Sequence, residues 1–303
     1  MRAAATSHFV LGPEPGSNGS RFLQLRGVDT VISNSRRHFC VAASILVAAT
    51  VCSAWHTPLH AAKITECAKI GTCYCVNEDL KPTIASKVER FRQMITDHRK
   101  TGKAVGYLSV PLTSAGGGNF NVNKEVAESA KAAIEKRFGA EFVWVLNPGT
   151  LDADLPKGTG TDYMLMWVTL IEGRDGFGDF DFVYFAGPQD FARYFGFDGN
   201  ADMAKLDAYF DKRAKADPEF ATAVEKGLTK AAFRKYYALR ASASVSRGAH
   251  DEWNIFRLIN ERRRADSKFG TGSQIPVLFD GRGVAPADSE ASVSEGYVGK
   301  CAL

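Results

Sequence analysis

Apolar residues recur at helical spacing in several segments of the chain. Between residues 82 and 101 the repeating positions are Ile84, Val88, Phe91 and Ile95. Pro82 suits the first turn of a helix and Gly102 suits its end. The same spacing predicts helices over 122–138 and roughly 248–264, and residues 188–240 are helical in character throughout. We therefore expect a long helical insertion over about 188–240.

Short runs of β-branched and aromatic residues predict strands between these helices. The runs cover residues 104–112, 141–146, 181–186 and 274–279. The first two flank the helix at 122–138, which makes a strand–helix–strand unit with a right-handed crossover. The pattern predicts an α/β protein with a partly parallel sheet, flanking helices and the helical insertion.

The segment YMLMWVTLI, residues 163–171, is apolar at every position except Thr169. Such a run fits either a buried strand or a short buried helix, and periodicity does not separate the two. We favour a strand, because the run at 181–186 follows across a loop typical of a hairpin or a wide turn. The tail from Asp280 is rich in Gly, Ser and acidic residues, which predicts irregular structure.

The N-terminal region has the pattern of a targeting segment. Ser35, Arg36, Arg37 and Phe39 match S-R-R-x-F, and a moderately apolar run and small residues follow. This resembles the twin-arginine export signal of bacteria, which implies the export machinery and a signal peptidase as partners and a periplasmic or secreted location. The alternative is a buried helix after a chance Arg pair. We predict an upstream extension and signal over 1–62 and one α/β domain over 63–303.

Cysteine usage agrees with an oxidising compartment. Outside the signal the chain has four cysteines, which are Cys67, Cys73, Cys75 and Cys301. An even number favours disulfides in an exported protein. Cys73 and Cys75 are too close for an unstrained mutual bond, so Cys67 should pair with one of them and Cys301 with the other. A zinc site is the alternative, but C-x-C fits the usual C-x2–4-C spacing poorly. We expect no metal and no cofactor.

The charge distribution argues against nucleic acid as a partner. The chain has a formal net charge of +4, but residues 1–62 hold five Arg and two acidic residues, which leaves 33 basic and 32 acidic residues in 63–303. Nucleic-acid binding needs a clustered basic excess. The run Arg262 to Arg264 is more typical of a solvated helix face. No segment of 63–303 has the length and apolarity of a membrane span.

Two segments have residues suited to ligand binding. Gly116, Gly117 and Gly118, followed by Asn119, come after a predicted strand and before a helix, where backbone amides can approach an anion. The alternative is a flexible loop in which Asn caps the helix. The sequence contains no G-x-S-x-G, no H-E-x-x-H and no P-loop motif. In 63–303 only His98 and His250 remain, which excludes a His-rich metal site.

The second segment is SRGAHDEWNIFRLINERRR, residues 246–264. Asp251 and Glu252 should lie in the first turn of the helix, where the dipole favours negative charge. Helix N-termini that follow strands or loops are also where α/β proteins bind ligands. The alternative is an amphipathic helix with an acidic first turn and a basic surface.

Gly248, Glu252 and Trp253, in the pattern G-x-x-x-E-W, resemble a segment of nucleoside 2-deoxyribosyltransferase-like proteins. Tyr107 and Pro111 in GYLSVP match the family's preceding strand. YFAGP, residues 184–188, matches that strand better but stands at a different place in the chain order. The resemblance implies that Glu252 attacks the anomeric carbon of a nucleoside. The family's other acidic residue would correspond to Asp181 or Asp162.

These observations lead to one leading hypothesis and two alternatives. We expect an exported hydrolase or transferase that acts on N-glycosidic bonds of small, polar, nucleoside-like substrates. Glu252 is the expected nucleophile, and His250 or a second carboxylate protonates the departing base. The expected substrate-binding residues are Tyr107, Gly116, Gly117, Gly118, Asn119 and Trp253. The alternatives are a non-catalytic periplasmic or envelope binding protein and an interaction protein whose aromatic helices contact a partner.

Overall fold

The computed structural model describes residues 62–149, 152–270 and 272–302. They belong to the compact unit Thr57–Leu303. The twin-arginine motif falls in residues 1–61, outside the described residues, and the predicted boundary after residue 62 lies at the start of the described part. None of the helices in the described part of the chain combines the length and apolar character of a membrane span.

A five-stranded mixed sheet forms the centre of this unit. Its order is β4 (Val143–Leu146), β3 (Ala104–Ser109), β5 (Phe182–Phe185), β6 (Val277–Phe279) and β7 (Arg282–Gly283). The first four strands are mutually parallel, and β7 runs antiparallel to β6. The expected α/β class with a partly parallel sheet is confirmed.

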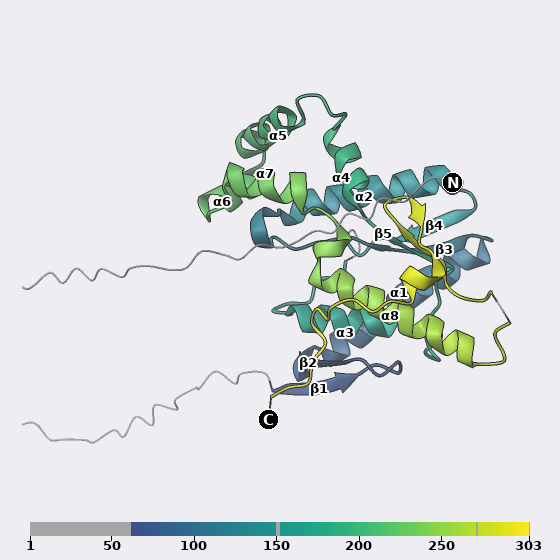
Figure 1. Ribbon diagram of the computed structural model, residues 1–303. Helices are drawn as coiled ribbons and strands as arrows, with labels where there is room; N and C mark the ends of the chain where they lie inside the picture. The colour runs from purple at the N-terminus through teal and green to yellow at the C-terminus, as the bar shows by residue number, and fades with distance from the viewer. Residues whose placement is uncertain (1–61, 150–151, 271, 303) are drawn as a thin grey trace, which may run out of the picture. The chain divides into compact units, whose positions relative to one another are not determined.

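Helices cover both faces of the sheet (Figure 1). One layer contains α1 (Lys81–Lys100), α3 (Gly160–Ile171) and α8 (Arg247–Ala265). The other contains α2 (Phe120–Phe138) and the insertion, made of α4 (Pro188–Phe195), α5 (Asp202–Ala216), α6 (Pro218–Glu225) and α7 (Lys230–Leu239). The insertion expected over about 188–240 therefore forms as four consecutive helices.

Strand β3 shows how the two cores are separated. Side chains alternate between the two faces of a strand. Val105 and Tyr107 accordingly join the core shared with α1, α3 and α8, whereas Leu108 and Val110 join the core under α2 and the insertion. This alternation directs Tyr107, and Ser109 two residues later, towards the layer that contains α8.

The strand expected at 163–171 is wrong, because these residues belong to helix α3. A capping box begins the helix, in which the Asp162 carboxylate accepts from the Thr159 backbone N–H at 2.7 Å. The helix packs against α1, α8 and β2 (Cys73–Asn77). Packing on several sides buries nearly the whole circumference, and a helix in that environment is apolar all round. The loop after α3 therefore leads to a parallel strand and forms no hairpin.

A small hairpin and the C-terminal tail complete the unit. β1 (Lys63–Cys67) pairs antiparallel with β2. Disulfides join Cys67 to Cys73 and Cys75 to Cys301, which is one of the two pairings that the cysteine spacing allowed. The tail is mostly irregular, as predicted, apart from β7 and the four-residue helix α9 (Pro286–Ser289). The second disulfide attaches the end of the tail to the hairpin at the start of the domain.

Candidate active site

A cavity of about 750 Å³ lies at the carboxyl ends of β3 and β4. The segments after these strands form one side, while α3 and the first turns of α8 form the other. Five aromatic side chains contribute to its wall, namely Phe120, Tyr163, Trp167, Tyr236 and Tyr297. We call this space the main cavity. Its size lies within the range of small-molecule binding sites, and its wall combines aromatic surface with a few polar groups.

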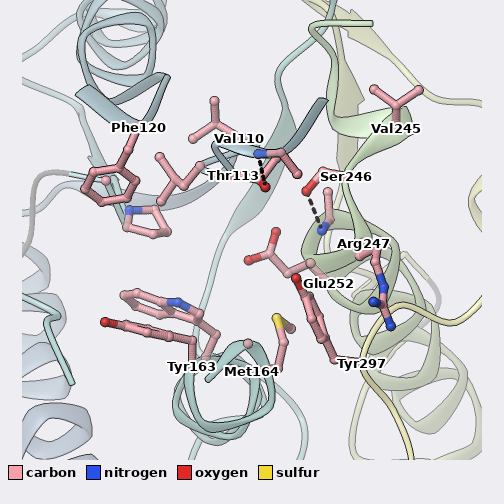
Figure 2. A pocket seen from close by; sticks show the side chains of 18 of the residues that line it. Val110, Thr113, Phe120, Tyr163, Met164, Val245, Ser246, Arg247, Glu252 and Tyr297 are labelled. Carbon is pink, nitrogen blue, oxygen red and sulfur yellow. Dashed lines mark hydrogen bonds between the residues drawn. The ribbon is translucent and has the colours of Figure 1, made fainter. Parts of the chain in front are cut away.

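Glu252 is a polar group of this wall. Ser246 caps the N-terminus of α8 by accepting the Ala249 backbone N–H at 3.4 Å. Glu252 follows in the second turn, on the helix side that faces the sheet. Its residue surface is only 7% exposed, yet its carboxyl group points into the main cavity (Figure 2). The structure therefore places the Glu252 carboxyl group at the wall of the main cavity.

Two side chains of β3 surround the same carboxyl group. The Tyr107 hydroxyl donates a hydrogen bond to Glu252 Oε1 at 2.5 Å, and Tyr107 is fully buried. The Ser109 hydroxyl is also buried, and no described residue lies in hydrogen-bonding geometry with it. Its dipole nevertheless favours the ionised form of the Glu252 carboxyl group. Because Tyr107 and Ser109 are two residues apart, both project from β3 towards α8.

Burial raises the pKa of Glu252 to about 7. The cause is the loss of water around the ionised form. The hydroxyls of Ser109 and Tyr107 oppose the shift, while the charge of Asp251 adds to it. Near neutral pH both the acid and the carboxylate are therefore populated. A carboxyl group with this property can serve as an acid, a base or a desolvated nucleophile.

The raised pKa predicts a pH-dependent cost to stability. The carboxyl group of the unfolded chain ionises near its ordinary pKa of 4.5, whereas the folded one holds its proton until about pH 7. As pH rises through this window, folding should lose about 3 kcal/mol through this group. Glu252→Gln removes the ionisation. Urea unfolding at pH 4 and pH 8 should show this extra loss in the wild type only, and parallel changes in both proteins would contradict the assignment.

Asp251, the neighbouring carboxylate, is fully buried but lies outside the wall of the main cavity. Its two oxygens accept the backbone N–H groups of Gly296 and Tyr297, each at 2.7 Å. The expectation that both carboxylates lie in the first turn of the helix is wrong, because α8 begins at Arg247 and places them in its second turn. The helix dipole alone therefore does not account for their presence. Asp251 holds the C-terminal tail, and Glu252 faces the main cavity.

The structure separates His250 and Trp253 from Glu252. Both line a second, largely apolar cavity of about 310 Å³ on another side of α8. His250 Nε2 lies 2.8 Å from the Ser244 carbonyl oxygen and Nδ1 lies 3.0 Å from Ser294 Oγ. The Trp253 indole contacts Phe185 with a centroid distance of 5.1 Å. Neither side chain is on the wall of the main cavity, so the geometry favours neither the acid role of His250 nor stacking by Trp253.

The glycine loop contributes less to the main cavity than expected. It forms the short 3-10 helix η2 (Ala115–Gly117), and Gly116 lines the cavity. Gly117 packs against α7, where a Cβ would lie 2.2 Å from the Ala232 carbonyl oxygen. Gly118 and Asn119 are not on the wall. Asn119 caps α2 by accepting the Val122 N–H at 3.1 Å, which is the structural alternative stated for this residue.

The two expected counterparts of the family's acidic residue are also structural. Asp162 accepts the Asn77 backbone N–H at 2.8 Å besides capping α3. Asp181 accepts the Val105 N–H at 2.7 Å, at the amino end of β3 and so at the opposite sheet edge from Glu252. Among the described residues of the main cavity wall, the second carboxyl group belongs to Asp154. Its place after the carboxyl end of β4 is the signal that could have identified it.

No cluster of three or more His, Cys, Asp or Glu side chains with a geometry suited to a metal ion occurs within residues 62–149, 152–270 and 272–302.

Comparison of the chain with protein-family models, with curated proteins and with solved structures found no match.

Proposed function

We propose that the protein is an exported hydrolase or transferase that cleaves N-glycosidic bonds of nucleoside-like substrates. The observation that supports this most directly is Glu252, a buried carboxyl group with a pKa near 7 that faces the main cavity. The G-x-x-x-E-W resemblance assigns the nucleophile to the same residue. Burial of a carboxylate without a cationic partner is costly, which makes a chemical role its most economical explanation.

The reaction would proceed in two steps. The Glu252 carboxylate attacks the anomeric carbon, an ester bond to the sugar forms, and the carbon–nitrogen bond breaks as the base leaves with the bonding electrons. Water or a second base then attacks the same carbon and releases the carboxylate. Since Tyr107 occupies Oε1, Oε2 is the oxygen available for attack. The hydroxyl also orients the group.

The departing base needs a proton. Asp154 is the other carboxyl group on the wall of the main cavity, and it is exposed on its loop. We assign it the role of passing a proton from solvent water to the departing base, in place of His250, whose ring faces the second cavity. The aromatic side chains of the wall provide faces on which a nucleobase can stack.

The two disulfides support the exported location. Disulfides persist in oxidising compartments and are rare in cytosolic proteins. Cys67–Cys73 and Cys75–Cys301 both involve the N-terminal hairpin of the described unit. Together with the twin-arginine resemblance, they favour a periplasmic or secreted protein.

A non-catalytic binding protein is the second candidate. The size and aromatic wall of the main cavity suit a small polar ligand without any reaction. The two functions differ in one observable result. An enzyme releases the free base, whereas a binding protein leaves the nucleoside intact. The position of Glu252 favours catalysis, because simple binding does not require a carboxyl group with a raised pKa.

The test is release of free base from purified, oxidised protein incubated with a panel of ribonucleosides and deoxyribonucleosides. Chromatography measures base and sugar. We expect kcat/KM to increase with pH around pH 7, because attack requires the ionised carboxylate and kcat/KM reports the pKa of the free protein. Absence of base release from every nucleoside would refute the enzyme, and calorimetric binding of the intact nucleosides would then favour the binding protein.

A further inference from the structure

The C-terminal segment 291–301, which we call the strap, crosses α8 and is held by it. Five side chains of α8 bond to the strap, and they are Arg247, His250, Asp251, Trp253 and Asn254. The Trp253 indole N–H donates to the Ala291 carbonyl at 2.9 Å. Asn254 donates to the Val293 carbonyl at 3.0 Å and accepts its N–H at 3.1 Å. The strap thus takes up much of the polar surface of the helix that contains Glu252.

Asp251 is the most deeply buried of these contacts. Its two oxygens bind the successive N–H groups of Gly296 and Tyr297. Arg247 Nε donates to the Gly296 carbonyl at 2.9 Å. Hydrogen bonds to a charged group are stronger than those between neutral partners. These bonds from α8 therefore fix the backbone of two consecutive strap residues, Gly296 and Tyr297, at the point where the strap reaches the main cavity.

Tyr297 is the strap residue that reaches the main cavity, where it forms part of the same wall as Glu252 (Figure 2). The Arg247 guanidinium lies 4.5 Å from the centre of its ring. The ring also packs against the backbone of Gly160, where a Cβ would lie 2.4 Å from a ring carbon. The ring is therefore held between α8 and the start of α3.

The strap is also attached beyond Tyr297, at the N-terminal hairpin. The Gly299 N–H donates to the Cys73 carbonyl at 2.9 Å, and the Cys301 N–H donates to Thr65 Oγ1 at 2.9 Å. The Cys75–Cys301 disulfide adds a covalent attachment. Residue 297 is thus fixed from both sides, by α8 before it and by the hairpin after it.

We propose that Tyr297 is a specificity-determining residue of the main cavity, and that the Cys75–Cys301 disulfide fixes the strap so that the ring stays in place. The proposal rests on the proposed function, because it assigns Tyr297 the contact with the base or sugar of the substrate. It explains why His250, Asp251, Trp253 and Asn254 stand beside Glu252 in the sequence. They position the wall of the site and take no part in the reaction.

Because the Cys75–Cys301 disulfide holds the strap, we expect Tyr297 to stay fixed in the cavity wall only while this bond is oxidised. A dithiol reductant would transfer two electrons and two protons to Cys75–Cys301, which yields two thiols and the reductant's own disulfide. The strap then has only hydrogen bonds to hold it. We expect weaker substrate binding in the reduced protein, with the chemistry at Glu252 retained.

The first experiment measures kcat and KM for nucleoside cleavage in three variants. Tyr297→Ala removes the ring and should raise KM about tenfold while kcat changes little, since the variant loses the stacking of the base on one aromatic side chain. Tyr297→Phe keeps the ring and should keep the wild-type KM. Gly160→Ala leaves the strap sequence intact but displaces the ring, so it should raise KM as well.

A merely structural role would reduce the amount of folded protein and leave KM of the remainder unchanged. That result in both Tyr297→Ala and Gly160→Ala would overturn the assignment of Tyr297. If the wild-type protein releases no base, the proposed function itself fails. Calorimetry with a C-nucleoside, whose glycosidic carbon–carbon bond resists cleavage, then decides the role of Tyr297 by affinity alone. Equal affinity of wild type and Tyr297→Ala, or no affinity, overturns it.

The second experiment tests the attachment without any substrate. Hydrogen exchange of the Val293, Gly296 and Tyr297 amides is compared between two double variants of the full chain. One is Cys75→Ser with Cys301→Ser, and the matched control is Cys67→Ser with Cys73→Ser, which removes the other disulfide of the same hairpin. We expect faster exchange in the first variant only. Equal exchange in both would overturn the role of the disulfide.

Discussion

Glu252→Gln should lower kcat for nucleoside cleavage about 10³-fold or more, with a much smaller change in KM. The amide has the same size and still accepts the hydrogen bond from Tyr107, so the main cavity keeps its shape. An amide oxygen is too weak a nucleophile to form the ester bond to the sugar. The variant therefore removes the reaction and retains binding. Single-turnover and steady-state base release measure the effect.

Glu172 provides a matched control for this substitution. It is also a buried glutamate, 3% exposed, and burial raises its pKa as well. Its carboxylate accepts the Ile70 backbone N–H at 3.1 Å at the end of α3, and it is not on the wall of the main cavity. Glu172→Gln should keep kcat within a small factor of the wild type. Equal losses in both variants would mean that Glu252 contributes to folding and not to the reaction.

Removal of the Cys75–Cys301 disulfide should cost far more stability than removal of Cys67–Cys73. The first bond joins residues 226 apart in the sequence, and the second joins residues 6 apart. In the chain-entropy model the longer loop stabilises the folded state by about 5 kcal/mol and the shorter by about 2 kcal/mol. The difference arises because the long cross-link removes much more freedom from the unfolded chain.

Denaturant unfolding of the two double serine variants, each compared with the oxidised wild type, measures this difference. The variant without Cys75–Cys301 should have the lower midpoint and a larger m-value, since its unfolded chain is less compact. The activity of the variant without Cys67–Cys73 should stay close to the wild type, because that bond lies within the hairpin. Equal destabilisation would show that loop length does not govern the contribution of these bonds.

Local pattern accounts for most of the helices and for the parallel strands. The helices expected at 82–101, 122–138 and 248–264 correspond to α1, α2 and α8 within two residues at each end. Cysteine spacing limited the disulfides to two pairings, and the one with Cys67–Cys73 and Cys75–Cys301 forms. These features depend on periodicity, end signals and short-range geometry, which a sequence displays directly.

Helix α3 shows where local pattern is insufficient. A continuously apolar run fits two structures, and the choice depended on which elements would surround it. The capping box formed by Thr159 and Asp162 was the local signal for a helix. The roles of neighbouring side chains on α8 were equally hidden, because only packing shows that Glu252 faces the main cavity and His250 the second one.

The sequence by itself determined the α/β class and the order of most elements, reduced the disulfides to two possible pairings and offered Glu252 as the candidate nucleophile. The tertiary structure decided the burial of Glu252 against Tyr107, the contribution of Asp154 and Tyr297 to the cavity wall, and the exclusion of His250 from it. The reason is that periodicity is a property of neighbouring residues, whereas desolvation and cavity shape depend on segments far apart in the chain. Residues 107, 154, 252 and 297 meet only when the sheet, α8 and the strap have assembled.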